Sequence, residues 1–346
     1  MTFQELIDYA IARQASDVHV TVGTACALRR FGKLEILPDA PTAEESKQMI
    51  LESLTDEQKE KVLSGEDLDF ALFANNGFRL RANVYHQRNN IAASYRILNQ
   101  EIPSFEELTI PVPVQKLIDE PRGLVLITGP TGSGKTTTMA SMIDYINRTR
   151  NLHVMTIEDP IEYVYYHNKS MIHQREVGKD VDSFAKAVRS ALREDPDIIM
   201  VGEMRDYETI SAAITAAETG HLVISTLHTT SASQTIERIL DAYPPHAQGQ
   251  ARTQLANVLR GVVTQLLMPE LDGDGMVLAT EVLLNNDAVA AQIRDNKTYQ
   301  IQSTIQSNMA MGMHTLETDL KRLMGSFRIS REEAVAAANN PKELRI

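Results

Sequence analysis

The chain has 346 residues, 43 % of them apolar and 23 % charged, a composition typical of a soluble protein long enough for two domains. Its single cysteine, Cys26, excludes a disulfide framework and a thiolate metal cluster, and we expect it to be a small buried residue in a reducing compartment. Because no apolar run approaches the roughly 20 residues of a membrane helix, no export signal is visible and the net charge is −12, the sequence predicts a cytoplasmic protein without nucleic-acid partners.

Residues 1–100 predict a small α+β domain. Two helical patterns, at 3–14 and 42–63, each open with a Thr-x-x-Glu capping box. Short strands are expected between and after them, at Asp17–Thr21, Ala27–Phe31, Leu68–Phe73, Arg79–Tyr85 and Ile91–Ile97. Asn75-Asn76-Gly77, between the third and fourth of these strands, is a hairpin signal.

A proline-spaced linker is expected at 101–115, and the pattern changes after it. Between 116 and 280, apolar runs alternate with helical stretches; the strands are expected at 123–128, 153–157, 197–201 and 222–227 and the helices at 134–148, 183–194 and 207–218. Apolar strands separated by helices indicate a parallel sheet buried on both faces, and hence an α/β core. Residues 281–346 are expected to be largely helical, ending in a helix capped by Ser330.

A phosphate-binding loop lies between the first strand of this core and the helix that follows it. Its glycines allow backbone N–H groups to surround phosphate oxygens at the positive end of a helix. The lysine reaches the β- and γ-phosphates, and the threonine after it can join the Mg²⁺ shell. We therefore predict an ATP site formed by Gly129, Pro130, Thr131, Gly132, Ser133, Gly134, Lys135, Thr136 and Thr137.

Acidic residues follow two further strands of the core, at the edge where ligands bind to open parallel sheets. ATP hydrolysis needs an acid that holds Mg²⁺ or its waters and a carboxylate that orients the attacking water. Glu203, two residues after Val201, is the best candidate for these roles. Glu158, Asp159 and Glu162 form a second acidic cluster, and a solvated loop acid or helix cap is the alternative for each. Asp197 precedes its strand and is expected to be structural.

Two histidines, His221 and His228, flank the strand at 222–227. Seven residues of a regular strand span roughly 23 Å, so the two cannot share one metal ion. Packing or hydrogen bonding is the commoner role of a lone histidine.

Arginines mark one face of a strand in the first domain. Arg79 and Arg81 alternate with apolar residues and face outward, and Arg96 ends the next strand. Arginine suits a γ-phosphate because its planar fork stays charged and donates bidentately. A plain solvated strand face is the alternative.

These motifs resemble the type IV pilus retraction ATPases, of the PilT/PilU type, in the secretion-ATPase superfamily. The resemblance spans most of the chain. Besides the phosphate-binding loop, it rests on Ala15–Val20, Phe78–Asn83, Thr156–Glu162, Arg189–Asp197, Val201–Asp206, Ala217–His221 and Thr226–Thr230. Residues 288–295 match only part of a stretch common to retraction motors. A single cysteine cannot supply the tetracysteine module of assembly ATPases, which favours retraction.

The resemblance implies a PAS-like domain joined to a RecA-like ATPase domain, assembled as a homo-hexameric ring. Glu162 falls on the family's Asp-box glutamate and Glu203 on its Walker B glutamate, and both histidines fall on its His boxes. The arginines of the first domain fall in the region that reaches nucleotide. The implied partners are ATP, Mg²⁺, an inner-membrane pilus platform protein and a further pilus ATPase, at the inner face of the cell membrane.

Three alternatives stay open at this point. One is a DNA-translocating or conjugation-type ATPase, which the net charge of −12 disfavours. The second is a nucleotide-binding regulatory subunit with negligible turnover. The third is an accessory retraction subunit in place of the main motor.

Overall fold

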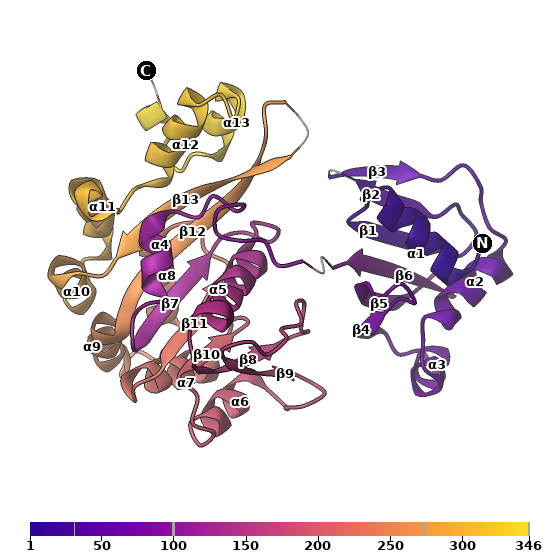
Figure 1. Cartoon of the computed structure of the whole chain (residues 1–346), viewed down its shortest axis with the longest axis horizontal. Coiled ribbons are helices and arrows are strands. Elements are labelled where there is room, and N and C mark those ends of the chain that lie inside the picture. Colours follow the sequence, from indigo (N-terminus) through magenta and orange to yellow (C-terminus); the bar gives the residue numbers. More distant parts are fainter. Residues whose placement is uncertain (31, 99–100, 273–274, 345–346) are drawn as a thin grey trace. The chain divides into compact units, whose positions relative to one another are not determined.

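The computed structural model describes residues 1–30, 32–98, 101–272 and 275–344 and divides the chain into two compact units, drawn in Figure 1. The first unit consists of Met1–Glu101 with Pro160–Val164, and the second of Ile102–Asp159 with Tyr165–Ile346. The predicted boundary residue 100 and the predicted strand end Phe31 lie outside the described residues.

The first unit is an antiparallel six-stranded sheet with helices on one face. The strand order is β3-β2-β1-β6-β5-β4. Its core contains Leu6 and Ile7 from the first helix and Met49 and Ile50 from the second. The elements are α1 (Phe3–Ala12), β1 (Asp17–Thr21), β2 (Ala27–Arg30), β3 (Lys33–Ile36), α2 (Ala43–Glu52), α3 (Asp56–Leu63), β4 (Leu68–Phe73), β5 (Arg79–Gln87) and β6 (Asn90–Ile97).

Local signals predicted most of this unit, with two differences. The capping boxes at Thr2 and Thr42 are both present, and the predicted hairpin joins β4 to β5. The single helix expected at 42–63 is wrong: it is two helices, because Thr55 caps α3 through a box with Gln58 and the Ser53 hydroxyl bonds back to the Ile50 carbonyl. The edge strand β3 was not predicted.

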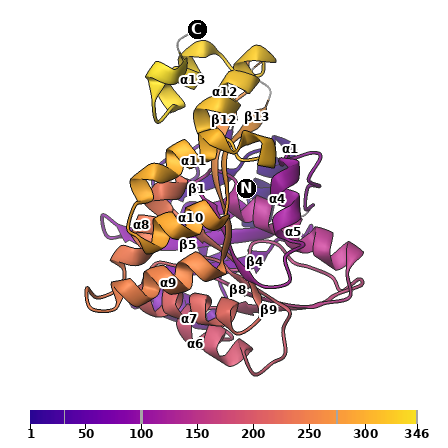
Figure 2. The same cartoon turned by 90° about the vertical axis from the view of Figure 1, so that its left-hand side faces the viewer.

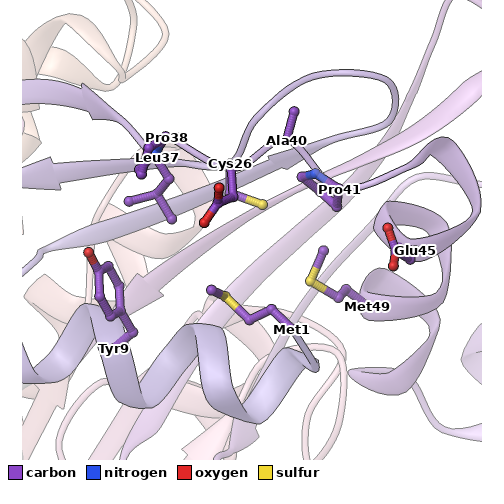
Figure 3. A pocket seen from close by; sticks show the side chains of 10 residues that line it. Met1, Tyr9, Cys26, Leu37, Pro38, Ala40, Pro41, Glu45 and Met49 are labelled. Atoms are coloured by element: carbon purple, nitrogen blue, oxygen red, sulfur yellow. The ribbon is translucent and has the colours of Figure 1, made fainter.

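A cavity of about 300 Å³ lies inside the first unit, shown in Figure 3. It is bounded by α1, α2 and the segment 37–41, and Met1, Cys26 and Met49 all border it. Cys26 is buried and free, as expected, and burial raises the pKa of its thiol.

The second unit is a seven-stranded sheet in the order β13-β12-β7-β11-β10-β8-β9, parallel except for the edge strand β13. Its strands are β7 (Gly123–Thr128), β8 (His153–Glu158), β9 (Met171–Glu176), β10 (Ile198–Val201), β11 (Leu222–Leu227), β12 (Leu259–Pro269) and β13 (Met276–Leu284). The α-helices are α4 (Val112–Leu117), α5 (Lys135–Thr149), α6 (Phe184–Ala191), α7 (Tyr207–Glu218), α8 (Ala232–Asp241), α9 (Gln248–Val258), α10 (Asp287–Arg294), α11 (Ile301–Ser307), α12 (Leu316–Gly325) and α13 (Arg331–Ala337), with 3₁₀ turns at Thr298–Gln300, Met309–Met311 and Pro341–Leu344.

Helices cover both faces of this sheet, as the two views in Figures 1 and 2 show. The helices α4 and α5 lie on one face, and α7, α8 and α9 lie on the other. The strands between them are therefore apolar throughout: every residue of β7, β10 and β11 is buried. The expected linker is partly helical, because α4 begins within it.

The part after residue 280 is helical, as predicted, and its last α-helix has the expected Ser330 capping box with Glu333. The strands β9, β12 and β13 were not predicted. In β9 polar residues are mixed with apolar ones, and in β12 and β13 polar residues such as Gln265, Thr280 and Glu281 interrupt the apolar runs. No helix in the described ranges is long and apolar enough to cross a membrane.

Candidate active site

The phosphate-binding loop joins β7 to α5 in a conformation that requires glycine. Gly129, Gly132 and Gly134 have φ values of +144°, +80° and +84°. A side chain on Gly129 would also collide with the Gln265 carbonyl oxygen of β12, so the loop is held against the sheet. The first backbone N–H groups of α5 are thereby presented at the loop.

Polar groups inside this loop are held ready for an anion. Lys135 is 8 % exposed, and its Nζ donates to the carbonyl oxygens of Gly129 and Pro130, each at 2.9 Å. The Ser133 hydroxyl is buried without a hydrogen-bond partner among the described residues. Thr138 accepts a hydrogen bond from Gln265 at 2.7 Å. The arrangement fits phosphate oxygens, which would satisfy the Ser133 hydroxyl and draw Lys135 away from the carbonyls.

The sheet order places the ends of β11 and β10 on the same side of the sheet as this loop. β11 neighbours β7 and ends before His228, and β10 neighbours β11 and ends before Gly202 and Glu203. The turn at Glu203 is fixed from β11, since the Thr226 hydroxyl donates to the Gly202 carbonyl at 2.7 Å and the Met204 amide donates to the Thr226 carbonyl at 3.1 Å.

Glu203 and His228, which follow the neighbouring strands β10 and β11, meet at this edge. His228 Nε2 lies 3.6 Å from Glu203 Oε2, and Arg205 Nε donates to Glu203 Oε1 at 2.7 Å. The Glu203 side chain is 16 % exposed, whereas Arg205 is largely in solvent. A partly buried carboxylate held by one oxygen keeps the other available to orient a water or a metal ion.

Glu158 and Asp159 end the next strand, β8, and differ in exposure. Glu158 is buried, and its Oε1 accepts from the Thr156 hydroxyl at 2.6 Å and the Gln174 amide at 3.2 Å. Asp159 is exposed. Of the two, Asp159 is the more exposed residue, while the Glu158 carboxylate is oriented by Thr156 and Gln174.

Glu162 belongs to the segment Pro160–Val164, which is part of the first unit. Its side chain is partly exposed. Glu162 therefore belongs to a different unit from Glu158 and Asp159.

His221 lies at the other end of β11 from His228, as expected for two residues that flank this strand. It precedes β11, and its carbonyl accepts from Gly123 at the start of β7, the end opposite to the phosphate-binding loop. Its Nδ1 lies 3.0 Å from the Ala216 carbonyl oxygen, a local role. Asp197 is structural, as expected: it accepts from the His153 amide at 2.8 Å.

The three arginines of the first unit share one face of its sheet. Arg81 and Arg96 are direct cross-strand partners, and Arg79 lies two residues along β5 on the same side. Arg81 pairs with Asp69 at 2.8 Å, and Arg96 pairs with Asp17 at 2.9 Å. The predicted alternation is confirmed, because Leu80, Ala82 and Val84 are fully buried.

A small cavity of about 130 Å³ lies beside the start of α5. It is lined by Gly134, Thr137 and Thr138 on one side and by apolar side chains of β12 and β13 on the other. Arg328 and Glu107 also border it. Thr137, a predicted nucleotide ligand, therefore lines a cavity together with apolar side chains from outside the phosphate-binding loop.

Two residues of this site were missed by sequence reasoning. Arg205 follows Glu203 by two positions, and its charge beside a strand-end acid was a usable signal. Gln265 gave none, because its place behind the phosphate-binding loop depends on β12 pairing with β7.

Known proteins match the chain over nearly its whole length. A family described as Type II/IV secretion system protein matches residues 2–326. The type IV pilus retraction ATPase PilT of Pseudomonas aeruginosa is 41 % identical over 345 residues, covering 99 % of both chains. A twitching motility protein of Neisseria gonorrhoeae is 45 % identical over 303 residues, which cover 88 % of this chain and 81 % of that protein.

A solved structure agrees with these sequence matches. The crystal structure of the pilus retraction motor PilT with bound ADP has a TM-score of 0.90 and 45 % sequence identity, covering 99 % of both chains. The geometry of the phosphate-binding loop, the position of Glu203 and these matches all indicate an ATPase. The chain belongs to the Type II/IV secretion system protein family and is an ATPase of the pilus retraction type.

Proposed function

We propose that this protein is a motor ATPase that hydrolyses ATP with Mg²⁺ and uses the energy to retract a type IV pilus. One observation carries the proposal: a phosphate-binding loop lies at the same sheet edge as a partly buried acid, Glu203, which Arg205 holds by one oxygen and which lies 3.6 Å from His228. A nucleotide-binding protein without turnover has no need of the second feature.

The residues of the loop fit a magnesium nucleotide. Lys135 and the backbone amides of residues 129–137 bind phosphate, and Thr136 with Glu203 supplies the hard oxygen ligands that Mg²⁺ prefers. Asp159 is the exposed second acid of the same edge. When bound, Mg²⁺ neutralises charge that develops on the phosphate oxygens.

Glu203 and His228 act on the attacking water. Glu203 orients the water through whichever oxygen is not engaged by its neighbours, and His228 and Arg205 hold the carboxylate in place. Glu162 is the second acid proposed to share this work. The cavity beside Thr137 and Thr138 receives the nucleotide base, since its walls are mainly apolar.

Arg79, Arg81 and Arg96 complete the site from a neighbouring chain in a homo-hexameric ring. Their shared face provides three cations on one rigid sheet, which suits the charge that develops on a transferred γ-phosphate. The ring works at the cytoplasmic side of the membrane on a platform protein of the pilus machinery, and a further pilus ATPase is a second partner.

The test is a paired measurement of turnover and movement. We expect the purified protein to hydrolyse ATP, to lose that activity in EDTA and to regain it with added Mg²⁺. The gene should restore twitching to a strain that lacks its retraction ATPase, and the Lys135→Ala variant should not. Turnover that rises several-fold with DNA and no recovery of twitching would instead support a DNA-translocating ATPase.

A further inference from the structure

Asp17 of β1 is a nearly buried acid on the sheet face that carries the three arginines of the first unit. It is 8 % exposed. Its Oδ1 accepts from Arg96 Nε at 2.9 Å, and its Oδ2 accepts from the Ser16 hydroxyl at 2.8 Å. Because both carboxylate oxygens are engaged, the Asp17 side chain is fixed, and Arg96 is attached to a fixed group.

The register of the strands explains why Asp17 pairs with Arg96. The strand β1 is paired on both sides, and Asp17 is the direct partner of Arg96 on β6 and of Arg29 on β2. Direct partners place their side chains on the same face of a sheet. Arg29 uses another acceptor, since its Nη1 donates to the Gly32 carbonyl at 3.1 Å. Asp17 therefore lies between two arginines and holds one of them.

A neutral pair lies next to this ion pair on the same face. His19 is the register partner of Ser94, and its Nδ1 lies 2.8 Å from the Ser94 hydroxyl. Burial lowers the pKa of His19, and the charges of Arg29 and Arg96 lower it further. Asp17 acts in the opposite direction. At neutral pH His19 is thus uncharged and does not compete with Arg96 for the carboxylate.

The guanidinium of Arg96 is held from one side only. Asp17 binds its Nε, and neither Nη1 nor Nη2 of Arg96 donates to another group within the ranges that the structure describes. The Arg96 side chain is 57 % exposed, against 12 % for Asp17. The anchor is therefore buried, while the two terminal NH₂ groups stay available for a ligand. Two such groups of one arginine can donate parallel hydrogen bonds to a phosphate.

Arg81, the register partner of Arg96 on β5, is held in a different way. Its Nε and Nη2 donate to the two oxygens of Asp69, at 3.2 and 2.8 Å, and the Asp69 side chain is 46 % exposed. An ion pair this close to the surface adds little stability and exchanges readily. Arg81 must leave Asp69 to bind a phosphate through the same nitrogens, whereas Arg96 can bind one without leaving Asp17.

We propose that Asp17 is the positioning residue of Arg96, and that Arg96 donates through its two terminal NH₂ groups to the γ-phosphate of ATP. This inference rests on the proposed ATPase function, in which the arginines of the first unit complete the site. Asp17 does not touch the nucleotide; it fixes the Nε side of Arg96 before the nucleotide binds. A donor fixed in advance needs no reorganisation when charge develops on the phosphate, so the effect of Asp17 falls mainly on kcat.

A double-mutant cycle separates positioning from a general structural role. Asp17→Ala should lower kcat about tenfold to a hundredfold, with a smaller change in KM, because Arg96 is then free to move. Asp17→Asn keeps an oxygen that can accept from Arg96 Nε and should recover part of this loss. Arg96→Ala should lower kcat at least as far as Asp17→Ala does, and adding Asp17→Ala to it should cause no further loss.

Asp56→Ala is the matched control for the loss of one aspartate from the first unit. Asp56 lies in the first turn of α3, and its side chain is 98 % exposed. Its kcat should stay at the wild-type value. Thermal unfolding shows whether each variant is folded. If Asp17→Ala is not, Asp17→Ser takes its place in the cycle, because serine keeps a polar group there but is too short to hold Arg96 Nε.

Nucleotide binding gives a second readout that does not require turnover. A hydrolysis-resistant ATP analogue carries a γ-phosphate and ADP lacks one, so the ratio of their Kd values reports the contact of Arg96 with this group. Asp17→Ala and Arg96→Ala should both shift the ratio several-fold in favour of ADP, and the double variant should shift it no further than Arg96→Ala. Asp56→Ala should leave the ratio unchanged.

The inference is overturned if Asp17→Ala or Arg96→Ala keeps the wild-type kcat. It is also overturned if the double variant loses the product of the two single losses, because Asp17 would then act independently of Arg96. A wild type that binds both nucleotides without hydrolysis, with the expected shifts in the Kd ratio, would refute the proposed function and leave the role of Asp17 standing. A wild type without turnover whose variants show no shift would overturn both.

Discussion

Lys135 is the residue on which the nucleotide chemistry depends most directly. Its ammonium group is bonded to two loop carbonyls, so it is already directed at the space where phosphate oxygens would replace them. We expect Lys135→Ala to lower turnover by at least about a hundredfold and to weaken nucleotide binding strongly, because no other cation of the loop can take its place. Steady-state turnover and ADP titration measure the two effects. A variant with near-normal turnover would contradict the assignment of the site.

Glu203 should separate binding from hydrolysis. Glu203→Gln keeps the shape of the side chain but removes the charge that orients water and metal, so turnover should fall about 10²–10⁴-fold while ATP binding stays close to normal. Glu208→Gln, an exposed acid in the first turn of α7, is a suitable control for the loss of one negative charge. Equal turnover in the two variants would remove Glu203 from the mechanism.

Glu281 makes a prediction for stability against pH. Its folded-state pKa of about 7 lies above the ordinary 4.5, so the folded protein binds more protons between these values and stability falls as the pH rises from 4.5 to 7. Glu281→Gln cannot lose this proton. From pH 5 to pH 8 its free energy of unfolding, measured in urea, should therefore gain on the wild type by up to about 3 kcal/mol. A constant difference across this range would contradict the raised pKa.

Residue-level reasoning from the sequence worked where the signal was local. The phosphate-binding loop and the strand-end position of Glu203 depend on neighbours within a few residues. The contact of Glu203 with His228 depends on β10 and β11 being neighbours in the sheet. No local sequence pattern shows which strands of a parallel sheet are neighbours. The position of His221 at the opposite end of β11 from His228 was a local prediction, and the structure agrees with it.

Among the elements, β5 has one buried face and one face that presents arginines, and this leads to a prediction for Arg81. Arg81 is paired with Asp69 near the surface, where an ion pair contributes at most about 1 kcal/mol, so Arg81→Ala should leave the fold intact. If Arg81 stabilises the charge that develops on the γ-phosphate, the rate of ATP hydrolysis in Arg81→Ala should fall about 10³–10⁵-fold, with a smaller effect on nucleotide binding. Arg81→Lys should recover little, since lysine lacks the planar fork. Lys33→Ala, an exposed cation on β3 of the same unit whose register partner Arg30 lies on the opposite face of the sheet, is the control, and equal losses in the two Ala variants would refute a specific role.

The elements that the sequence predicted best are those with caps or uniform burial. Capping boxes placed the starts of α1, α2 and α13, and continuous apolar runs placed β7 and β11. The break between α2 and α3 was missed because a second capping box was not recognised at Thr55. The pair β12 and β13 was missed because it follows helix α9 directly, so no turn separates the helical pattern from the strand.

At the scale of the whole molecule, the proposal of shared sites predicts complementation between inactive chains. A Lys135→Ala chain retains its arginines, and an Arg81→Ala chain retains its phosphate-binding loop. In mixed rings, some neighbouring pairs then contain one intact copy of each, and part of the activity should return. Turnover is measured as a function of the mixing ratio, and co-purification through an affinity tag carried by only one of the two chains shows that mixed rings form. Mixed rings without any recovery, or a fully active monomer, would exclude a site shared between chains.

The edge strand β13 has a consequence for how the molecule avoids self-association. The middle of its outer edge is covered: the Thr280 amide donates to Asp319, and Val282 and His314 exchange two hydrogen bonds, at 2.9 and 3.1 Å. An uncovered edge of this length would be a template for strands of other molecules. The segment from His314 to Asp319 thus works as a guard against amyloid-like stacking. Asp319→Ala, which uncovers the Thr280 amide, should raise aggregation on heating even where the fold and the nucleotide site survive.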